Sequence, residues 1–177
     1  MAEIREVVQL GHPLLRIKAQ YVENIQDHHI QNLVDDLTAT VKQANGVGIA
    51  APQVAESCRL FIVASRPNPR YPHAPTMDAT AMINPKILAH STEVVKGWEG
   101  CLSIPGIRGL VPRYQVVEVE YRDRNGKLQK QELTDFVARI FQHELDHLDG
   151  IVFLDRMEST LDLVTEQEYQ KRIVAAS

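Results

Sequence analysis

Apolar residues recur at spacings of three and four in the N-terminal part of the chain, as Ile30, Leu33, Val34, Leu37 and Val41. This period is typical of an amphipathic helix that packs one face against a core. The pair Asn45-Gly46 follows and indicates where the helix ends. The next stretch, Gly46 to Gln53 (GVGIAAPQ), holds two glycines and a proline, and we expect a turn or loop there.

Other segments have the patterns of strands. Leu60 to Ala64 is a short, continuous apolar run, as expected for a buried strand. From Val117 to Tyr121 apolar residues alternate with charged ones, which predicts a half-buried strand. The pair Asn125-Gly126 is a hairpin signal, so Leu128 to Leu133 is expected to return as the partner strand. Four prolines between Ser65 and Thr80 indicate a long surface loop.

Two more helices are expected in the C-terminal third. Thr134 or Asp135 is suited to cap a helix that runs to about Leu148, where Gly150 is placed to end it. A last helical stretch is expected over Ser159 to Val174. Strands and helices are segregated along the chain, which predicts an α+β fold. A length of 177 residues without repeats or a break in composition predicts one domain, residues 1–177.

Composition narrows the class of protein. The apolar fraction is 44% and the charged fraction 24%, which is ordinary for a soluble globular protein. A net charge of −4 gives no overall basic field for sequence-specific nucleic acid binding. No apolar run approaches the ~20 residues that cross a bilayer, and the chain starts at Met1 without the apolar stretch of a signal peptide. With only two cysteines, of which Cys58 is expected to be inert, we predict a cytoplasmic protein without a membrane partner.

The second predicted helix carries an H-E-x-x-H motif made by His143, Glu144 and His147. Positions i and i+4 share a helix face, so two imidazoles can bind one metal ion while the glutamate reaches a water on that metal. Phe136 and Ile140 fall on the same stripe, which predicts an apolar pocket beside the metal. The alternative is an amphipathic helix with two surface histidines and two ordinary core residues.

A catalytic metal site usually has three protein ligands and one open position, so a third ligand is needed. The extension H-E-x-x-H-x-x-G-x-x-H fails because Phe153 stands at its last position. A zinc endopeptidase would take Glu166 or Glu168 from the next helix. A thiolate would come from Cys101, in a glycine-flanked stretch. A non-catalytic structural metal site is a further alternative, and it would leave Glu144 without a role.

Three separated stretches together resemble the three motifs of the peptide deformylases, in the same order and spacing. They are GVGIAAPQ at residues 46–53, EGCLS at 99–103 and QHELDH at 142–147, and the resemblance spans residues 4 to about 156. It implies the family's α+β fold, with mostly antiparallel sheets around a central helix that bears the H-E-x-x-H motif, and a C-terminal helix.

The resemblance also implies one divalent metal ion per chain, with Fe²⁺ in the cell and Zn²⁺, Ni²⁺ or Co²⁺ as alternatives. Its ligands would be Cys101, His143 and His147. The implied reaction is removal of the N-formyl group from the N-terminal formyl-methionine of new polypeptides, with release of formate. A metal-bound hydroxide would attack the formyl carbon, and Glu144 would act as general base and then as general acid.

The remaining site residues also follow from the resemblance. The side-chain amide of Gln53 and the backbone N–H of Leu102 would hydrogen-bond the formyl oxygen. The peptide would pair as an added strand with the first motif, and the methionine side chain would enter an apolar pocket. The implied substrate-binding residues are Val47, Gly48, Glu99, Gly100, Phe136 and Ile140.

The implied partners are N-formylmethionyl nascent peptides and, for some family members, the ribosome near its exit tunnel. Those members dock through a basic C-terminal helix. In this chain, residues 155–177 hold five acidic and three basic residues, a net charge of −2. This charge opposes docking of the segment on an RNA surface.

Overall fold

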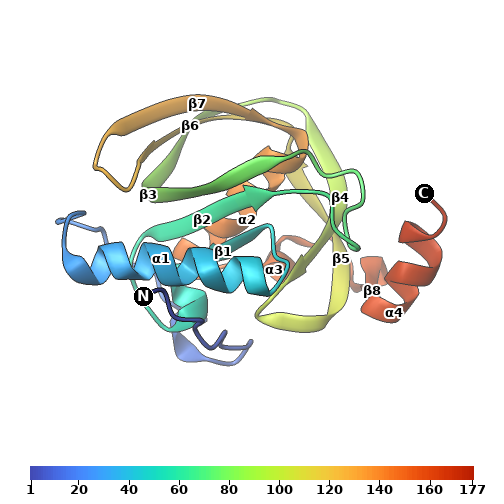
Figure 1. Cartoon of the computed structure of the whole chain (residues 1–177). Helices are drawn as coiled ribbons and strands as arrows, with labels where there is room; N and C mark the ends of the chain where they lie inside the picture. Colours follow the sequence, from blue (N-terminus) through green and yellow to red (C-terminus); the bar gives the residue numbers. More distant parts are fainter.

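Two antiparallel sheets meet around one central helix, as the computed structural model of all 177 residues shows (Figure 1). The five-stranded sheet has the order β1-β2-β3-β6-β7, and the three-stranded sheet has the order β4-β5-β8. The strands of the larger sheet are β1 (Gly48–Ala50), β2 (Leu60–Ser65), β3 (Met77–His90), β6 (Val116–Arg122) and β7 (Leu128–Thr134). Those of the smaller sheet are β4 (Val94–Cys101), β5 (Ile104–Tyr114) and β8 (Leu163–Thr165). The architecture confirms the α+β prediction.

The central helix, α2 (Asp135–Leu148), packs against both sheets. Its apolar face is buried, and the ring of Phe141 meets that of Phe61 on β2 edge-on, with centroids 5.3 Å apart. The helix has the predicted bounds, with Thr134 as N-cap residue, although the Thr134 side chain makes no capping hydrogen bond. Gly150 follows the helix with φ of 74°, a conformation that favours glycine.

Helix α1 (His28–Gln43) packs against β1 and β2 and confirms the first predicted helix (Figure 1). Its buried residues include Leu33, Val34, Leu37 and Val41, four of the five on the predicted stripe. The Asp27 carboxylate caps its N-terminus by accepting from the backbone N–H of His29 at 2.8 Å. This helix supports the first motif from outside, so the motif is held between α1 and α2.

The strand predictions are confirmed for β2 and for the β6–β7 hairpin, whose turn holds Gly126 at φ of 83°. Two loop predictions need correction. The stretch 46–53 is not only loop, because Gly48–Ala50 pairs with β2 and the 3₁₀-helix η2 (Ala51–Val54) follows directly. The proline-rich loop is shorter than expected, because β3 already begins at Met77.

The last predicted helix is also wrong in its first half. Residues 160–162 form a 3₁₀ turn (η3), and β8 then pairs with Ile107–Gly109 of β5. Helix begins only at α4 (Glu166–Tyr169), where the Thr165 hydroxyl accepts from the backbone N–H of Glu168 at 3.3 Å. It continues as the wider turns of η4 (Gln170–Val174). Pairing with β5 therefore overrides the helical pattern of residues 159–165.

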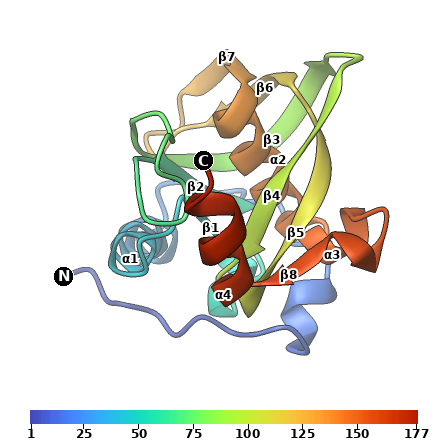
Figure 2. The same ribbon diagram turned by 90° about the vertical axis from the view of Figure 1, so that its right-hand side faces the viewer.

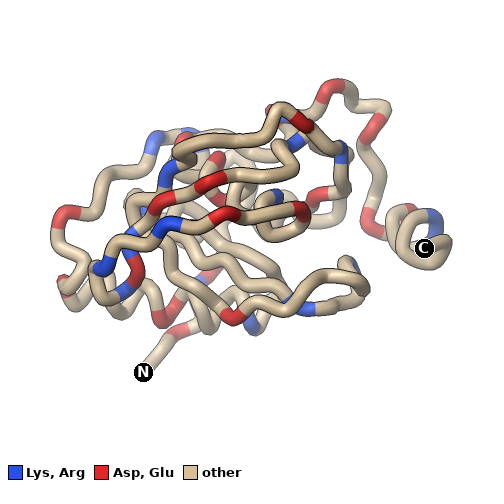
Figure 3. The backbone as a smooth tube through the Cα atoms, turned by 90° about the horizontal axis from the view of Figure 1, so that it is seen from above, with Lys and Arg blue, Asp and Glu red and all other residues tan.

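The C-terminal segment lies on the same side of the molecule as the loop between β2 and β3 (Figure 2). The Tyr169 hydroxyl donates to the backbone oxygen of Arg70 in that loop at 2.9 Å. Basic and acidic positions are scattered over the backbone without separating into large patches (Figure 3). None of the helices has the length and apolarity that crossing a bilayer requires.

Candidate metal centre and active site

One thiol and two imidazoles come together where the two sheets and α2 meet. The ligand atoms of Cys101, His143 and His147 all lie within 4.8 Å of one another. Cys101 Sγ lies 3.3 Å from His147 Nε2, and the two imidazole rings have centroids 5.1 Å apart. A thiolate with two imidazoles suits Zn²⁺ or Fe²⁺, so the donor set fits a divalent metal ion.

A helix positions the two histidines, and a strand hairpin positions the cysteine. The histidines share one face of α2 because they are four residues apart. Cys101 ends β4, at a hairpin whose two-residue turn is Leu102-Ser103 before β5. The β4–β5 register shifts between Glu99 and Cys101, a bulge-like irregularity at Gly100. The sulfur is thus carried on a hairpin tip that packs next to the helix.

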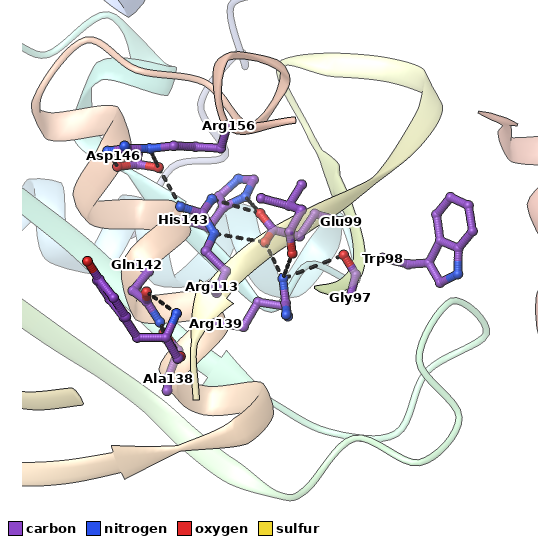
Figure 4. Close-up of polar contacts among 12 residues, drawn as sticks. Gly97, Trp98, Glu99, Arg113, Ala138, Arg139, Gln142, His143, Asp146 and Arg156 are labelled. Carbon is purple, nitrogen blue, oxygen red and sulfur yellow. Dashed lines mark hydrogen bonds and ion pairs between the residues drawn. The ribbon is translucent and has the colours of Figure 1, made fainter. Parts of the chain in front are cut away.

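The orientation of His143 is fixed by a carboxylate behind it. His143 Nδ1 lies 2.8 Å from Glu99 Oε1, which leaves Nε2 as the nitrogen for a metal. Glu99 also accepts two hydrogen bonds from Arg113, each of 2.9 Å, and one from Arg139 of 2.8 Å (Figure 4). Burial alone would raise the pKa of Glu99, but the charge of Arg113 and the hydrogen bonds of His143 and Arg113 hold it well below its usual range.

This ion-pair network extends away from the pocket. Arg113 Nη1 also donates to Asp146 Oδ2 at 2.5 Å, and Arg156 donates to both oxygens of Asp146 (Figure 4). Glu99 and Arg113 are only 3% and 5% exposed, so these charges stabilise one another in a water-poor interior. The carboxylate of Glu99 is therefore engaged in orienting the His143 ring.

Glu144 lies beside the cluster and is buried. Its Oε2 atom makes no hydrogen bond with the protein. Burial raises the pKa of the carboxyl to about 7. A carboxyl group with such a pKa can accept and return a proton near neutral pH.

Gln53 has its two amide atoms directed to different partners. Its Oε1 accepts from the backbone N–H of Ala50 at 2.9 Å. Its Nε2 donates to Ser103 Oγ at 3.1 Å and lies 3.5 Å from Cys101 Sγ. The side chain thus bonds its own loop and also presents an N–H group toward the cluster.

A pocket of about 340 Å³ opens next to these groups. Eleven of the twelve predicted site residues line it, and the twelfth, His147, is buried behind them. One wall is formed by Phe136 and Ile140 of α2, and others by the first and second motifs. The pocket lining from those motifs includes Val47, Gly48, Glu99, Gly100 and Leu102.

The alternatives for the third ligand fit less well. Arg108 Nε donates to Glu166 Oε2 at 2.5 Å, and Glu168 pairs with Arg172 on the surface. Neither glutamate belongs to the metal-binding group. The other cysteine, Cys58, is not part of it either, and burial raises the pKa of its thiol to about 12.

Sequence reasoning missed the residues that support and close the pocket. Arg113 belongs to the network behind Glu99, and Arg70, Tyr71 and Arg108 line the pocket. A lone arginine in a strand or a tyrosine in a proline-rich loop carries no signal in a single sequence. Only the tertiary pairing brings these residues to the site.

Comparison with known proteins identifies the family. The sequence model of the polypeptide deformylase family matches residues 4–162. The chain belongs to the peptide deformylase family. Its members are metal-dependent hydrolases that remove the N-formyl group from the formyl-methionine of new polypeptides, and this chain has a Cys/His/His group that could hold a metal ion.

Similar peptide deformylases occur in several bacteria. A protein from Nostoc sp. named peptide deformylase 2 is 71% identical over 171 residues, which are 97% of this chain and 96% of that protein. One from Shewanella oneidensis, also named peptide deformylase 2, is 44% identical and covers 92% and 89% of the two chains. The class I type b peptide deformylase from Acinetobacter baumannii, solved with Met-Ala-Ser bound, is similar in structure. Its TM-score is 0.86 at 46% identity, with 89% of this chain and all of that chain covered.

Proposed function

We propose that Cys101, His143 and His147 hold one divalent metal ion and that Glu144 carries the proton during removal of the formyl group. The observation that supports this most directly is the cluster itself. A thiol and two imidazoles have ligand atoms within 4.8 Å of one another, beside a buried carboxyl oxygen that has no protein partner.

The metal in the cell is proposed to be Fe²⁺, with Zn²⁺, Ni²⁺ and Co²⁺ able to replace it. Imidazole and thiolate ligands accept all four ions, so the donor set is compatible with each. When bound, the ion would act as a Lewis acid that activates water for attack on an amide. Loading the protein with each ion under anaerobic conditions, followed by measurement of formate release, would rank them.

Groups of the protein itself transfer the proton and stabilise the negative charge that develops on the formyl oxygen. Glu144 accepts the proton of the attacking water and delivers it to the leaving amine, and a pKa of about 7 supports both directions of transfer. Gln53 Nε2 and the backbone N–H of Leu102 donate hydrogen bonds to the formyl oxygen as its negative charge grows. Loss of one such donor typically lowers the rate by about 10²–10³-fold.

The substrate is proposed to bind as an extended peptide along β1. This strand is at the end of its sheet and pairs only with β2, so its other edge offers backbone groups. Val47, Gly48 and Gly100 would contact the peptide backbone, and Phe136 with Ile140 would enclose the methionine side chain. Glu99 would form part of this wall while its carboxylate orients His143. The Met-Ala-Ser complex of the Acinetobacter baumannii relative supports a peptide of this kind.

The proposed cellular location of the reaction is where its substrate, the nascent chain, is made. We propose that residues 1–177 act as one catalytic domain in the cytoplasm, on nascent chains near the ribosomal exit tunnel. Residues 155–177 carry five acidic and three basic side chains, so this segment is expected to leave ribosomal RNA unbound.

Formate release from formyl-Met-Ala-Ser tests the proposal. Glu144→Gln should retain the metal and lose at least about 10²-fold in kcat, because the proton carrier is gone. Cys101→Ala should lose the metal, whereas the matched control Cys58→Ala should keep both metal and activity. Metal retained by Cys101→Ala, together with cleavage of internal bonds in unformylated peptides, would instead support the endopeptidase alternative.

A further inference from the structure

A second cavity lies directly behind the active-site pocket. Its volume is about 280 Å³, compared with about 340 Å³ for the active-site pocket. It is lined by the loop between β2 and β3 and by C-terminal residues that include Tyr169, Ile173 and Val174. The two cavities share only Arg70, Tyr71 and Phe136 in their linings.

We propose that Tyr71 is a specificity-determining residue that closes the far end of the side-chain pocket. This inference rests on the proposed function, in which Phe136 and Ile140 enclose the N-terminal side chain of the substrate. The rings of Tyr71 and Phe136 have centroids 4.9 Å apart and an interplanar angle of 55°. Because both rings, together with Arg70, line both cavities, they separate one cavity from the other.

Tyr71 is also held by Arg108. Arg108 Nη1 donates to the Tyr71 hydroxyl oxygen at 2.9 Å, and that hydroxyl lies 3.4 Å from the backbone oxygen of Trp98. The Arg108 side chain is itself buried. A Cβ atom at Gly100 would lie 2.6 Å from Arg108 Nη1, so this glycine leaves room for the guanidinium.

The C-terminal segment fixes Arg108 in turn. Glu166 Oε2 accepts from Arg108 Nε at 2.5 Å, and the guanidinium carbon lies 5.0 Å from the centre of the Tyr169 ring. Arg108 and Glu166 therefore act as positioning residues for Tyr71. Through these contacts the C-terminal segment helps to position Tyr71, a role that does not depend on contact with the ribosome.

The two rings limit the length of the side chain that fits. The unbranched side chain of methionine would lie beside Phe136 and Ile140 in the first pocket and end at the two rings. A longer side chain would meet Tyr71, and without that ring its end would reach the apolar cavity behind. Because one methylene in an apolar pocket changes discrimination by about 10–200-fold, the ring should have a measurable effect on substrate choice.

The test compares kcat/KM for formyl-Met-Ala-Ser with that for the same peptide carrying homophenylalanine in place of methionine. Tyr71→Ala should raise the ratio of homophenylalanine to methionine at least about tenfold. Tyr71→Phe loses the hydrogen bond of the hydroxyl but keeps the ring, its contact with Phe136 and the Arg108 guanidinium carbon 5.4 Å from the ring centre, so its ratio should stay within about threefold of wild type. An unchanged ratio in a Tyr71→Ala variant that still processes the methionine peptide would overturn the proposal.

A second variant covers the case in which Tyr71→Ala does not fold. Arg108→Met keeps the Tyr71 side chain but removes both the hydrogen bond to its hydroxyl and the guanidinium beside its ring, so the ring is held less firmly and the ratio should rise by about threefold to tenfold. A wild-type ratio in this variant would then count against the proposal. Failure of the proposed function would look different, because wild-type protein would release no formate from the methionine peptide.

Discussion

At the scale of single residues, the site depends on close approaches that larger side chains would prevent. Glu144 can lie against the first motif only because residue 48 is glycine. A Cβ atom at Gly48 would be 2.5 Å from Glu144 Oε1 and 2.9 Å from its carboxyl carbon. Glu144 is buried, so its carboxylate has little room to move away. Gly48 therefore sets the position of the proposed proton carrier.

Gly48→Ala is expected to lower kcat by about 10²-fold, because a displacement of about 1 Å in a catalytic group costs that much. The metal content should stay at the wild-type level, since the three atoms nearest to the added Cβ all belong to Glu144. Steady-state kinetics and metal analysis measure the two quantities. Gly109→Ala is a matched control, because its Cβ would meet the flexible end of Met157 at 2.5 Å, away from Glu144. A wild-type kcat for Gly48→Ala would contradict the expectation.

Residue spacing explains how much of the site could be predicted. His143 and His147 come together through helix geometry alone, and Phe136 and Ile140 follow on the same face. Cys101 reaches them only through the β4–β5 hairpin, so the residues by themselves left a thiolate and a glutamate as competing ligands. The resemblance to a family resolved that choice. Tyr71 had no such guide, because its place depends on a loop and a distant segment.

At the scale of elements, buried polar groups attach α2 to the smaller sheet. Gln142 bonds the backbone of Tyr114 through both ends of its amide, at 3.0 Å and 2.9 Å. Arg113 on β5 bridges Glu99 on β4 and Asp146 on α2. These contacts fix the helix that carries two metal ligands against the hairpin that carries the third.

Arg113→Met is expected to lower the free energy of unfolding by about 3–5 kcal/mol, because it leaves buried carboxylates without their main partner. Chemical denaturation measures this loss. Arg172→Met removes an exposed arginine from an i,i+4 pair with Glu168 and should cost at most about 0.5 kcal/mol. Similar losses for the two variants would show that the buried network contributes no more than a surface ion pair.

The sequence pattern predicted those elements that are stabilised by residues close together in the chain, or whose two faces differ clearly in polarity. Helix α1, β2 and the β6–β7 hairpin are of this kind. Strands β4 and β5 escaped prediction because Gly97, Gly100, Pro105 and Pro112 interrupt any regular alternation. The short strands β1 and β8, with three residues each, exist only through pairing with β2 and β5. The residues within such a short strand cannot predict its pairing with another strand.

At the scale of the whole molecule, the C-terminal segment joins the smaller sheet to the loop that borders the pocket. Strand β8 covers the edge of β5 at Ile107–Gly109, Glu166 pairs with the buried Arg108, and Tyr169 bonds the backbone of Arg70. The segment beyond Gln170 makes none of these three contacts. The stabilising part of the segment is thus residues 163–170.

Two truncations distinguish the contribution of residues 163–170 to stability from that of residues 171–177. Deletion of residues 163–177 uncovers the β5 edge and leaves the Arg108 guanidinium without its carboxylate, so we expect a loss of at least about 2 kcal/mol and a greater tendency to aggregate. Deletion of residues 171–177 keeps β8, Glu166 and Tyr169 and should cost less than about 1 kcal/mol. Thermal unfolding and light scattering measure both effects. Because all three metal ligands lie outside the deleted segment, the metal content should match wild type in any folded truncation. Equal stability of the two truncations would mean that the smaller sheet is complete without β8.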